Sequence, residues 1–217
     1  AYYYERSQKT DLHTFISKGN GFSYQGDSGW WQSENGEYDG GKIRGMTSGD
    51  INGDGKDDVV MAYYYENSNR KTALHTFISR GDSFSYQGDS GWWEEEKSKY
   101  NGRSIRAMTS GDINGDGKDD VVIAYYYGSS VRTALHAFIS KGTTFTYQGS
   151  NWWKSEDGQY NADQIRGMSS GDINGDNKDD IVIAYHYGRS GRTALHTFVS
   201  NGSRFNYQGD SGWWQSN

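Results

Sequence analysis

The sequence contains no cysteine and no proline among its 217 residues. Without cysteine, the chain has no disulfide framework, no thiolate metal site and no cysteine nucleophile. It has no apolar run long enough to cross a membrane as a helix. Basic residues are not in excess, since the formal net charge is −6, and this argues against nucleic acids and anionic membranes as partners.

Apolar residues are scarce, because only 33% of the chain is hydrophobic, which is low for a globular core. Eighteen tyrosines and eight tryptophans compensate, since these side chains bury a large area and keep a polar group. Thirty glycines predict many turns. The first residues do not have the pattern of a signal peptide, and a mature secreted chain would look the same.

An internal repeat organises the sequence. The motif "AYYY" begins at Ala1, Ala62 and Ala124, and "AYHY" begins at Ala184, with spacings of 61, 62 and 60 residues. Each unit then contains "LHTF" or "LHAF", the tripeptide "YQG" and a pair of tryptophans. The last copy stops after this pair, so the chain holds three and a half units.

Within a unit the hydrophobic period is two, as in "TALHTFIS", and turn clusters such as "YNGRS" separate the segments. This pattern predicts about four short strands per unit and an all-β fold. A four-stranded repeat of about 60 residues is typical of one blade of a β-propeller, which has 4 to 8 blades. A β-sandwich or a solenoid of the same strands is the alternative.

The segment "GDINGDGKDD" occurs at Gly49 and Gly111, and as "GDINGDNKDD" at Gly171. Its alternating oxygen donors predict a Ca²⁺ site, because Ca²⁺ takes six to eight oxygen ligands in a flexible shell. Glycines permit the sharp turn, and Asn177, which replaces one of them, tolerates a left-handed backbone. The lysine in each loop is expected to contribute its backbone carbonyl. The predicted ligands are Asp50, Asn52, Asp54, Lys56 and Asp58; Asp112, Asn114, Asp116, Lys118 and Asp120; and Asp172, Asn174, Asp176, Lys178 and Asp180.

An EF-hand is excluded, because its twelfth position is Glu between flanking helices, whereas here that position is Met61, Ile123 or Ile183. The alternative to a metal site is an Asp- and Asn-rich turn that binds no metal. Four converging oxygen donors would repel one another without a cation, which favours calcium at three sites.

The segment "SGDINGDGKDDVVMAYYY" and its two relatives resemble the FG-GAP/VCBS repeat family of integrin-α-type β-propellers, which includes propeller lectins. The resemblance implies that the calcium loop joins the first two strands of a blade and that the metal is structural. It implies one repeat domain over residues 1–217, with a partial unit at 1–31 and blades at about 42–95, 103–154 and 164–215. The literal "FG" and "GAP" signatures are missing, and the aromatic half of each unit is not the general family pattern.

The incomplete first unit leaves three arrangements open. The chain forms a four-bladed ring with one short blade, a homo-oligomer that completes the ring, or part of a longer protein. The first unit lacks a first strand and a calcium loop, and the C-terminus does not supply them.

The aromatic half of each unit predicts a carbohydrate site, because Tyr and Trp stack on sugar rings and nearby polar groups bind the hydroxyls. Nearly identical units would give several equal sites and therefore avidity. We therefore expect a secreted, multivalent, calcium-binding lectin with glycans as partners. The predicted residues are Trp31, Trp93, Trp153 and Trp214; Tyr4, Tyr65, Tyr127 and Tyr187; His13, His75, His136 and His196; and Arg44, Arg106 and Arg166.

Packing is the alternative for several of these residues. The repeated histidine can be a core residue, and one tryptophan of each pair is expected in the core with the other free to bind. The repeated phenylalanines Phe15, Phe77, Phe138 and Phe198 are expected in the core. An integrin-like adhesion surface or a passive spacer is the alternative function. No nucleophile and base pair is assignable, so we expect no enzyme.

Overall fold

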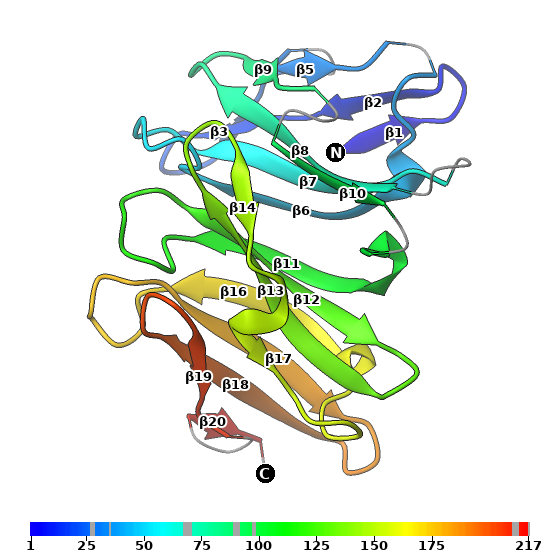
Figure 1. Cartoon of the computed structure of the whole chain (residues 1–217). Coiled ribbons are helices and arrows are strands. Elements are labelled where there is room, and N and C mark those ends of the chain that lie inside the picture. The colour runs from blue at the N-terminus through cyan, green and yellow to red at the C-terminus, as the bar shows by residue number, and fades with distance from the viewer. Residues whose placement is uncertain are drawn as a thin grey trace.

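The computed structural model describes residues 1–26, 29–34, 36–66, 71–88, 92–96, 99–209 and 213–216 (Figure 1). Parts of three of the four segments between "YQG" and the tryptophan pair lie outside these residues. The described residues form strands and four short 3₁₀ turns without any α-helix, which confirms the predicted all-β fold. No helix in the described part of the chain has the length and apolar content needed to cross a bilayer.

Each full repeat folds into one antiparallel sheet. The first of these sheets contains β6 (Ile43–Gly49), β7 (Asp58–Tyr64), β8 (Lys71–Ser79), β9 (Phe84–Tyr86) and β10 (Trp93–Glu96). Both β9 and β10 pair with β8, at opposite ends of it. The fourth strand is therefore interrupted, because Gly88, with a φ of 82°, turns the chain between its two halves. The sheet is four strands wide, as the repeat predicts.

The next two repeats have the same topology. One contains β11 (Ile105–Gly111), β12 (Asp120–Tyr127), β13 (Arg132–Ser140), β14 (Phe145–Tyr147) and β15 (Trp153–Lys154). The other contains β16 (Ile165–Gly171), β17 (Asp180–Tyr187), β18 (Arg192–Ser200), β19 (Phe205–Tyr207) and β20 (Trp214–Gln215). The 3₁₀ turns are η1 (Gly40–Lys42), η2 (Gly102–Ser104), η3 (Gly149–Asn151) and η4 (Ala162–Gln164).

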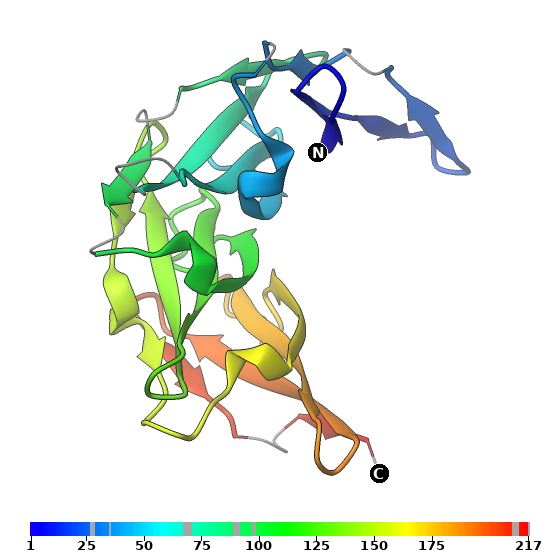
Figure 2. The same ribbon diagram turned by 90° about the vertical axis from the view of Figure 1, so that its right-hand side faces the viewer.

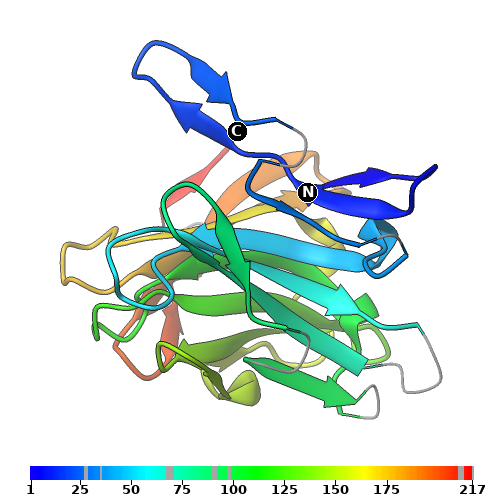
Figure 3. The ribbon, with the colours of Figure 1, turned by 90° about the horizontal axis from the view of Figure 1, so that it is seen from above.

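The N-terminal half-unit differs from the full repeats. β1 (Tyr2–Tyr4), β2 (Lys9–Leu12) and β5 (Trp31–Gln32) form a small sheet, and β3 (Phe15–Ser17) and β4 (Phe22–Tyr24) form a separate hairpin. In the full repeats the strand equivalent to β2 and β3 is continuous. In the half-unit β1 pairs with β2 and β3 pairs with β4, so the strand is divided and the hairpin extends away from the other sheets (Figure 3).

The sheets follow one another along an arc, with the two chain ends at the two ends of the arc (Figure 2). The first strands β6, β11 and β16 lie side by side on the concave side, where hydroxyl groups link them. Thr47 Oγ1 lies 2.8 Å from Ser110 Oγ, and Thr109 Oγ1 lies 3.1 Å from Ser170 Oγ. The arc is not closed within one chain, so a closed propeller stays a prediction.

The core lies between successive sheets, where the apolar face of one sheet packs on the next. Phe77, Phe138 and Phe198 are fully buried there, as predicted. The same prediction is wrong for Phe15, which is 56% exposed. A tryptophan of the preceding sheet covers each of the other three phenylalanines, whereas the ring that packs on Phe15 is Tyr24 of its own hairpin.

Candidate functional site

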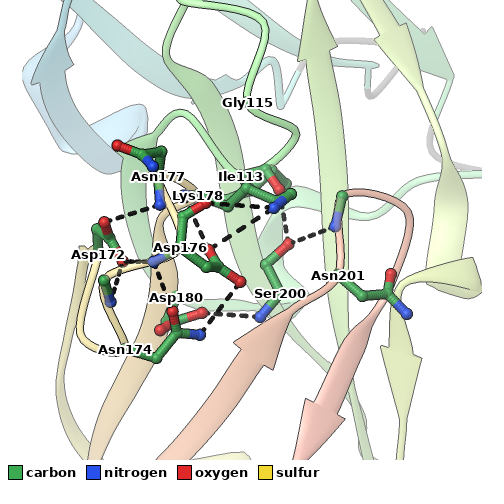
Figure 4. Close-up of polar contacts among 12 residues, drawn as sticks. Ile113, Gly115, Asp172, Asn174, Asp176, Asn177, Lys178, Asp180, Ser200 and Asn201 are labelled. Atoms are coloured by element: carbon green, nitrogen blue, oxygen red, sulfur yellow. Dashed lines mark hydrogen bonds and ion pairs between the residues drawn. The ribbon is translucent and has the colours of Figure 1, made fainter.

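The three acidic loops connect the first and second strands of their sheets, where the family resemblance places them. The first aspartate organises each loop by accepting hydrogen bonds from the backbone of the turn. Asp172 Oδ1 accepts from the N–H of Gly175 at 2.7 Å and of Asp176 at 3.0 Å, and Oδ2 accepts from Asn177 at 2.9 Å (Figure 4). Asn177 has a φ of 63°, which confirms the predicted left-handed turn residue.

The last aspartate of each loop ties the loop to the third strand of the sheet. Asp58, Asp120 and Asp180 are fully buried, and the Oδ1 atom of each accepts a backbone N–H from the third strand at 2.8 Å. Asp180 Oδ2, also buried, has no hydrogen-bond partner of normal geometry within the described part of the chain. Burial raises the pKa of this carboxyl and the backbone N–H groups of Ile173 and Asn174 lower it, so the carboxyl faces its own loop.

Burial makes these carboxylates difficult to ionise. It raises the pKa of Asp58 to about 6 and that of Asp120 to about 8, and nearby aspartates add to the effect. The pKa of Asp180 is also raised by burial. A bound cation would offset this cost by stabilising the charged form.

The loop chemistry fits a hard cation with oxygen ligands, because each loop offers carboxylate, carboxamide and carbonyl oxygens and no sulfur or nitrogen ligand. In the described residues, however, no three His, Cys, Asp or Glu side chains gather closely enough to form a metal site by themselves. The middle aspartate of the first loop, Asp54, forms an ion pair with the loop lysine, since its Oδ2 lies 3.2 Å from Lys56 Nζ. A cation would therefore also need the asparagine oxygen and the lysine carbonyl.

Successive loops are fastened to each other by a residue that the sequence analysis did not single out, the first aspartate of "DD". Asp119 Oδ2 accepts the backbone N–H of Asp50 at 2.9 Å, and Asp179 Oδ2 accepts that of Asp112 at 3.0 Å. Ser140 Oγ also donates to the Ile51 carbonyl in the preceding loop at 2.6 Å. Neighbouring sheets are therefore linked to each other through their loops.

A second candidate site is a cavity at the junction between sheets. The cavity between the small N-terminal sheet and the first full sheet has a volume of about 350 Å³. Trp31 and Tyr38 form its aromatic wall together with Tyr86 of the next sheet. Its polar lining is Gln32, Ser33, Glu34 and Glu37.

The same cavity recurs two units further along the chain, with a volume of about 380 Å³. The lining residues correspond one for one to those of the first cavity: Trp153, Lys154, Ser155, Glu156, Gln159, Tyr160 and Tyr207. A smaller cavity of about 230 Å³ lies on a single sheet, where β8 and β10 supply its described lining, Lys71 and Glu94 to Glu96. The two junction cavities share the carboxylate and the aromatic wall, whereas their rim charge differs, because Lys154 replaces Gln32.

Both tryptophans of the first three pairs take part in the junctions. Trp30 packs against Phe84 with ring centroids 5.1 Å apart, and Trp31 packs edge-on against Phe77 at 4.7 Å. The expectation that one tryptophan of a pair lies in the core agrees with Trp92 and Trp152, which are buried. The second tryptophan of these pairs is half-buried, contacts the next sheet and lines the cavity at two junctions, so its role in binding stays a prediction. At the end of the arc Trp213 and Trp214 are both exposed.

The repeated histidines of the full units are buried in the sheets. His136 Nε2 lies 3.0 Å from Tyr127 Oη, and its Nδ1 lies 3.0 Å from Tyr147 Oη. Burial lowers the pKa of His136 to about 4, so the ring is neutral at physiological pH. His75 has the equivalent contacts with Tyr65 and Tyr86. His196 Nε2 lies 2.9 Å from Tyr187 Oη and its Nδ1 lies 2.8 Å from Tyr160 Oη, so tyrosine hydroxyls hold all three buried rings, which favours the packing alternative.

The remaining predicted residues are not among the described residues that line the two junction cavities, although Tyr187 lines a separate cavity beside η4. His13 and Tyr4 contact each other in the N-terminal half-unit at 3.2 Å, and Tyr65 and Tyr187 bond to the buried histidines. The arginines lie on the first strands: Arg44 contacts Glu66, Arg106 contacts Asp163 at 2.7 Å, and Arg166 donates to backbone carbonyls of its own turn. The structure therefore brings two of the four predicted tryptophans, Trp31 and Trp153, to the junction cavities, whose described lining includes none of the predicted histidines and arginines.

Sequence reasoning missed most of the cavity wall. The tyrosine of "YQG" and the tyrosine that precedes each 3₁₀ turn, such as Tyr38 and Tyr160, repeat in every full unit and were the available signal. The serine and glutamate after the tryptophan pair recur at only two of the junctions.

A family model described as an FG-GAP-like repeat matches residues 50–123 and 112–183. The two overlapping matches together span well over half of the chain and include all three acidic loops. No curated protein matches the chain.

Proposed function

Because the chain belongs to the FG-GAP-like repeat family, we propose that it is a calcium-stabilised, propeller-type binding protein that holds carbohydrate at the junctions between sheets. The role is binding rather than catalysis, since the repeated cavities are nearly equal and contain no nucleophile with an adjacent base.

The loop residues support a Ca²⁺ ion in each of the three acidic loops. The donor set is entirely oxygen, and a buried carboxylate closes each loop against the third strand. Asp172, Asn174, Asp176 and Asp180, with the carbonyl of Lys178, would hold the ion of the third loop. A bound ion supplies positive charge that fixes the hairpin. Its role is therefore structural.

The repeated cavity is the observation that carries the carbohydrate proposal. An aromatic wall offers a surface on which the apolar face of a sugar ring can stack, and the serine and glutamate offer acceptors for its hydroxyls. Both cavities lie within the size range of small-ligand sites, about 300–1,000 Å³. A monosaccharide or a terminal sugar of a glycan is the ligand that this size and chemistry favour.

Equivalent sites on one rigid arc favour multivalent binding to a glycan-coated surface, because linked weak sites gain avidity. The proposed setting is extracellular. Calcium sites of extracellular modules have dissociation constants of about 10⁻⁴–10⁻³ M, which extracellular calcium fills.

A glycan array probed once with calcium and once with a chelator tests the proposal. Selective binding supports carbohydrate recognition, and its loss with the chelator supports a scaffold that depends on calcium. Binding that survives the chelator keeps the glycan function and limits calcium to a stabilising role. If a folded sample binds no glycan on the array, this result would contradict carbohydrate binding and favour the protein-binding or spacer alternative.

A further inference from the structure

The three junctions between successive sheets share one backbone contact and one ring contact. The N–H groups of Phe84, Phe145 and Phe205 donate to the carbonyls of Trp30, Trp92 and Trp152, respectively, at 2.9, 3.0 and 2.8 Å. The rings of the same pairs lie 5.1, 5.3 and 5.0 Å apart. At each junction the first tryptophan of a pair thus contacts the phenylalanine that begins β9, β14 or β19 of the next sheet.

The second tryptophan of each pair makes an equally regular contact. Trp153 packs edge-on against Phe198, with ring centroids 4.7 Å apart, and lies 5.7 Å from the ring of Tyr207. The preceding junctions repeat this arrangement at nearly the same distances. A tryptophan pair on one side and a Phe–Phe–Tyr face on the other therefore define the junction.

The two ends of the arc present these two halves without a partner sheet. At the N-terminal end, Phe22 is 75% exposed, whereas its equivalent Phe205 is 3% exposed, and Phe15 and Tyr24 are exposed beside it. At the C-terminal end, Trp213 is 48% exposed, whereas its equivalent Trp152 is 5% exposed. Trp214 is exposed as well.

The acidic loops independently indicate that the last sheet lacks the following sheet that covers its equivalents. Ile113 is buried, and its carbonyl accepts a hydrogen bond from Ser200 Oγ of the following sheet at 2.6 Å. The equivalent Ile173 of the last sheet is 39% exposed. The residue equivalent to Ser200 in the N-terminal hairpin is Ser17, at the end of β3.

We propose that Trp213 and Trp214 of one copy dock on the face formed by Phe15, Phe22 and Tyr24 of a second copy of this chain. The contact repeats the internal junction, with the Phe22 N–H directed to the Trp213 carbonyl and the Ser17 hydroxyl directed to the Ile173 carbonyl. The ends lie far apart on one arc, so a chain does not make this contact with itself (Figure 2).

The proposed contact is head-to-tail, because the two surfaces are different and complementary. Two arcs that dock reciprocally close a ring through two identical junctions. Five large aromatic side chains, each with about 150–250 Å² to bury, supply a substantial part of the roughly 1,000 Å² that a specific interface needs.

The second copy also contributes to a site. The first cavity is lined by Trp31, Ser33 and Tyr86. Their equivalents at the two ends of the arc are Trp214, Ser216 and Tyr24, respectively. Docking would therefore bring the walls of a further junction cavity together. The docking itself does not depend on what the cavities bind.

Complementation between two variants tests the proposal. A W213S/W214S variant lacks the docking pair, and an F15S/F22S variant lacks the receiving face. All four side chains are about half-exposed or more, so neither change removes a core contact. Circular dichroism verifies the fold of each variant. Wild-type chain 1–217 and a Glu5→Gln control are compared with both variants by sedimentation velocity across a wide concentration range.

We expect wild type and the control to associate and each variant alone to be a monomer. An equimolar mixture of the two variants should form a two-chain complex, since one intact half remains on each. A two-copy ring or a longer head-to-tail series of wild type both support the docking. Monomeric wild type at every concentration, or two folded variants that do not combine, would overturn it.

Discussion

Individual repeated residues have different roles that the sequence alone does not separate. The histidine and the last aspartate of the loop both recur in every full unit, and both are buried. The aspartate faces a loop of oxygen donors, whereas the histidine is held between tyrosine hydroxyls. Strand alternation predicts which face a residue occupies, but it does not predict whether that face meets solvent or another sheet.

The neutral state of His136 predicts an acid-dependent loss of stability. Its pKa in the fold, about 4, lies below its ordinary value of 6.5, so the folded state disfavours the proton. The contribution is fully present above pH 6.5 and falls by about 1.4 kcal/mol per pH unit as the pH decreases toward 4. Urea unfolding of wild type and His136→Gln should show a stability difference that shrinks over this interval. A difference that is constant with pH would rule this explanation out.

Replacing Asp120 by Asn should separate two effects of this carboxylate: the stability lost by burying its charge and the calcium affinity gained from that charge. The amide keeps an acceptor for the Ser140 N–H but carries no charge, so the metal-free variant should be at least as stable as wild type. The calcium-dependent rise in melting temperature should decrease, because one of the three loops loses a ligand. Thermal unfolding with calcium and with EDTA measures both effects. Asp82→Asn, at an exposed turn, is the control. An equal calcium response in D120N and wild type would contradict the assignment.

At the scale of elements, the sequence predicted the strands and the acidic turns because both depend on local patterns. Alternation predicted β8, the apolar run after the acidic loop predicted β7, and the Asp, Asn and Gly pattern predicted the loop between β6 and β7. The interruption of the fourth strand into β9 and β10 was not predicted. It depends on where the chain bends back to reach the next sheet, and the local pattern of apolar and polar residues does not determine that position.

The left-handed backbone of the loop predicts a specific cost at Gly55. This residue has a φ of 84°, and a Cβ atom placed there would meet no other atom within 4 Å. Gly55→Ala should therefore lower the free energy of unfolding by about 1 kcal/mol through backbone strain alone. Gly171→Ala is the matched control, since it is equally uncrowded and has no positive φ. Denaturant unfolding that finds the two variants equally stable would argue against strain in the loop.

At the scale of the molecule, the repeat count predicted a series of equivalent sheets, and the structure confirms it. The cavities were harder to predict, because each combines a tryptophan of one unit with a tyrosine of the next. The exposed aromatic ends were also missed, since the residues there have the same sequence as their buried equivalents. Only the order of the sheets along the arc distinguishes them (Figure 2).

The central claim is that the two junction cavities are equal carbohydrate sites. Calorimetric titration with the glycan that the array selects tests it most directly, using wild type, Glu34→Gln, Glu156→Gln, the double variant and the exposed control Glu5→Gln. Loss of a charged acceptor should weaken its own site about tenfold or more. We therefore predict that each single variant loses one strong site and that the double variant loses both, while the control matches wild type. Unchanged stoichiometry and affinity in the double variant would contradict the claim.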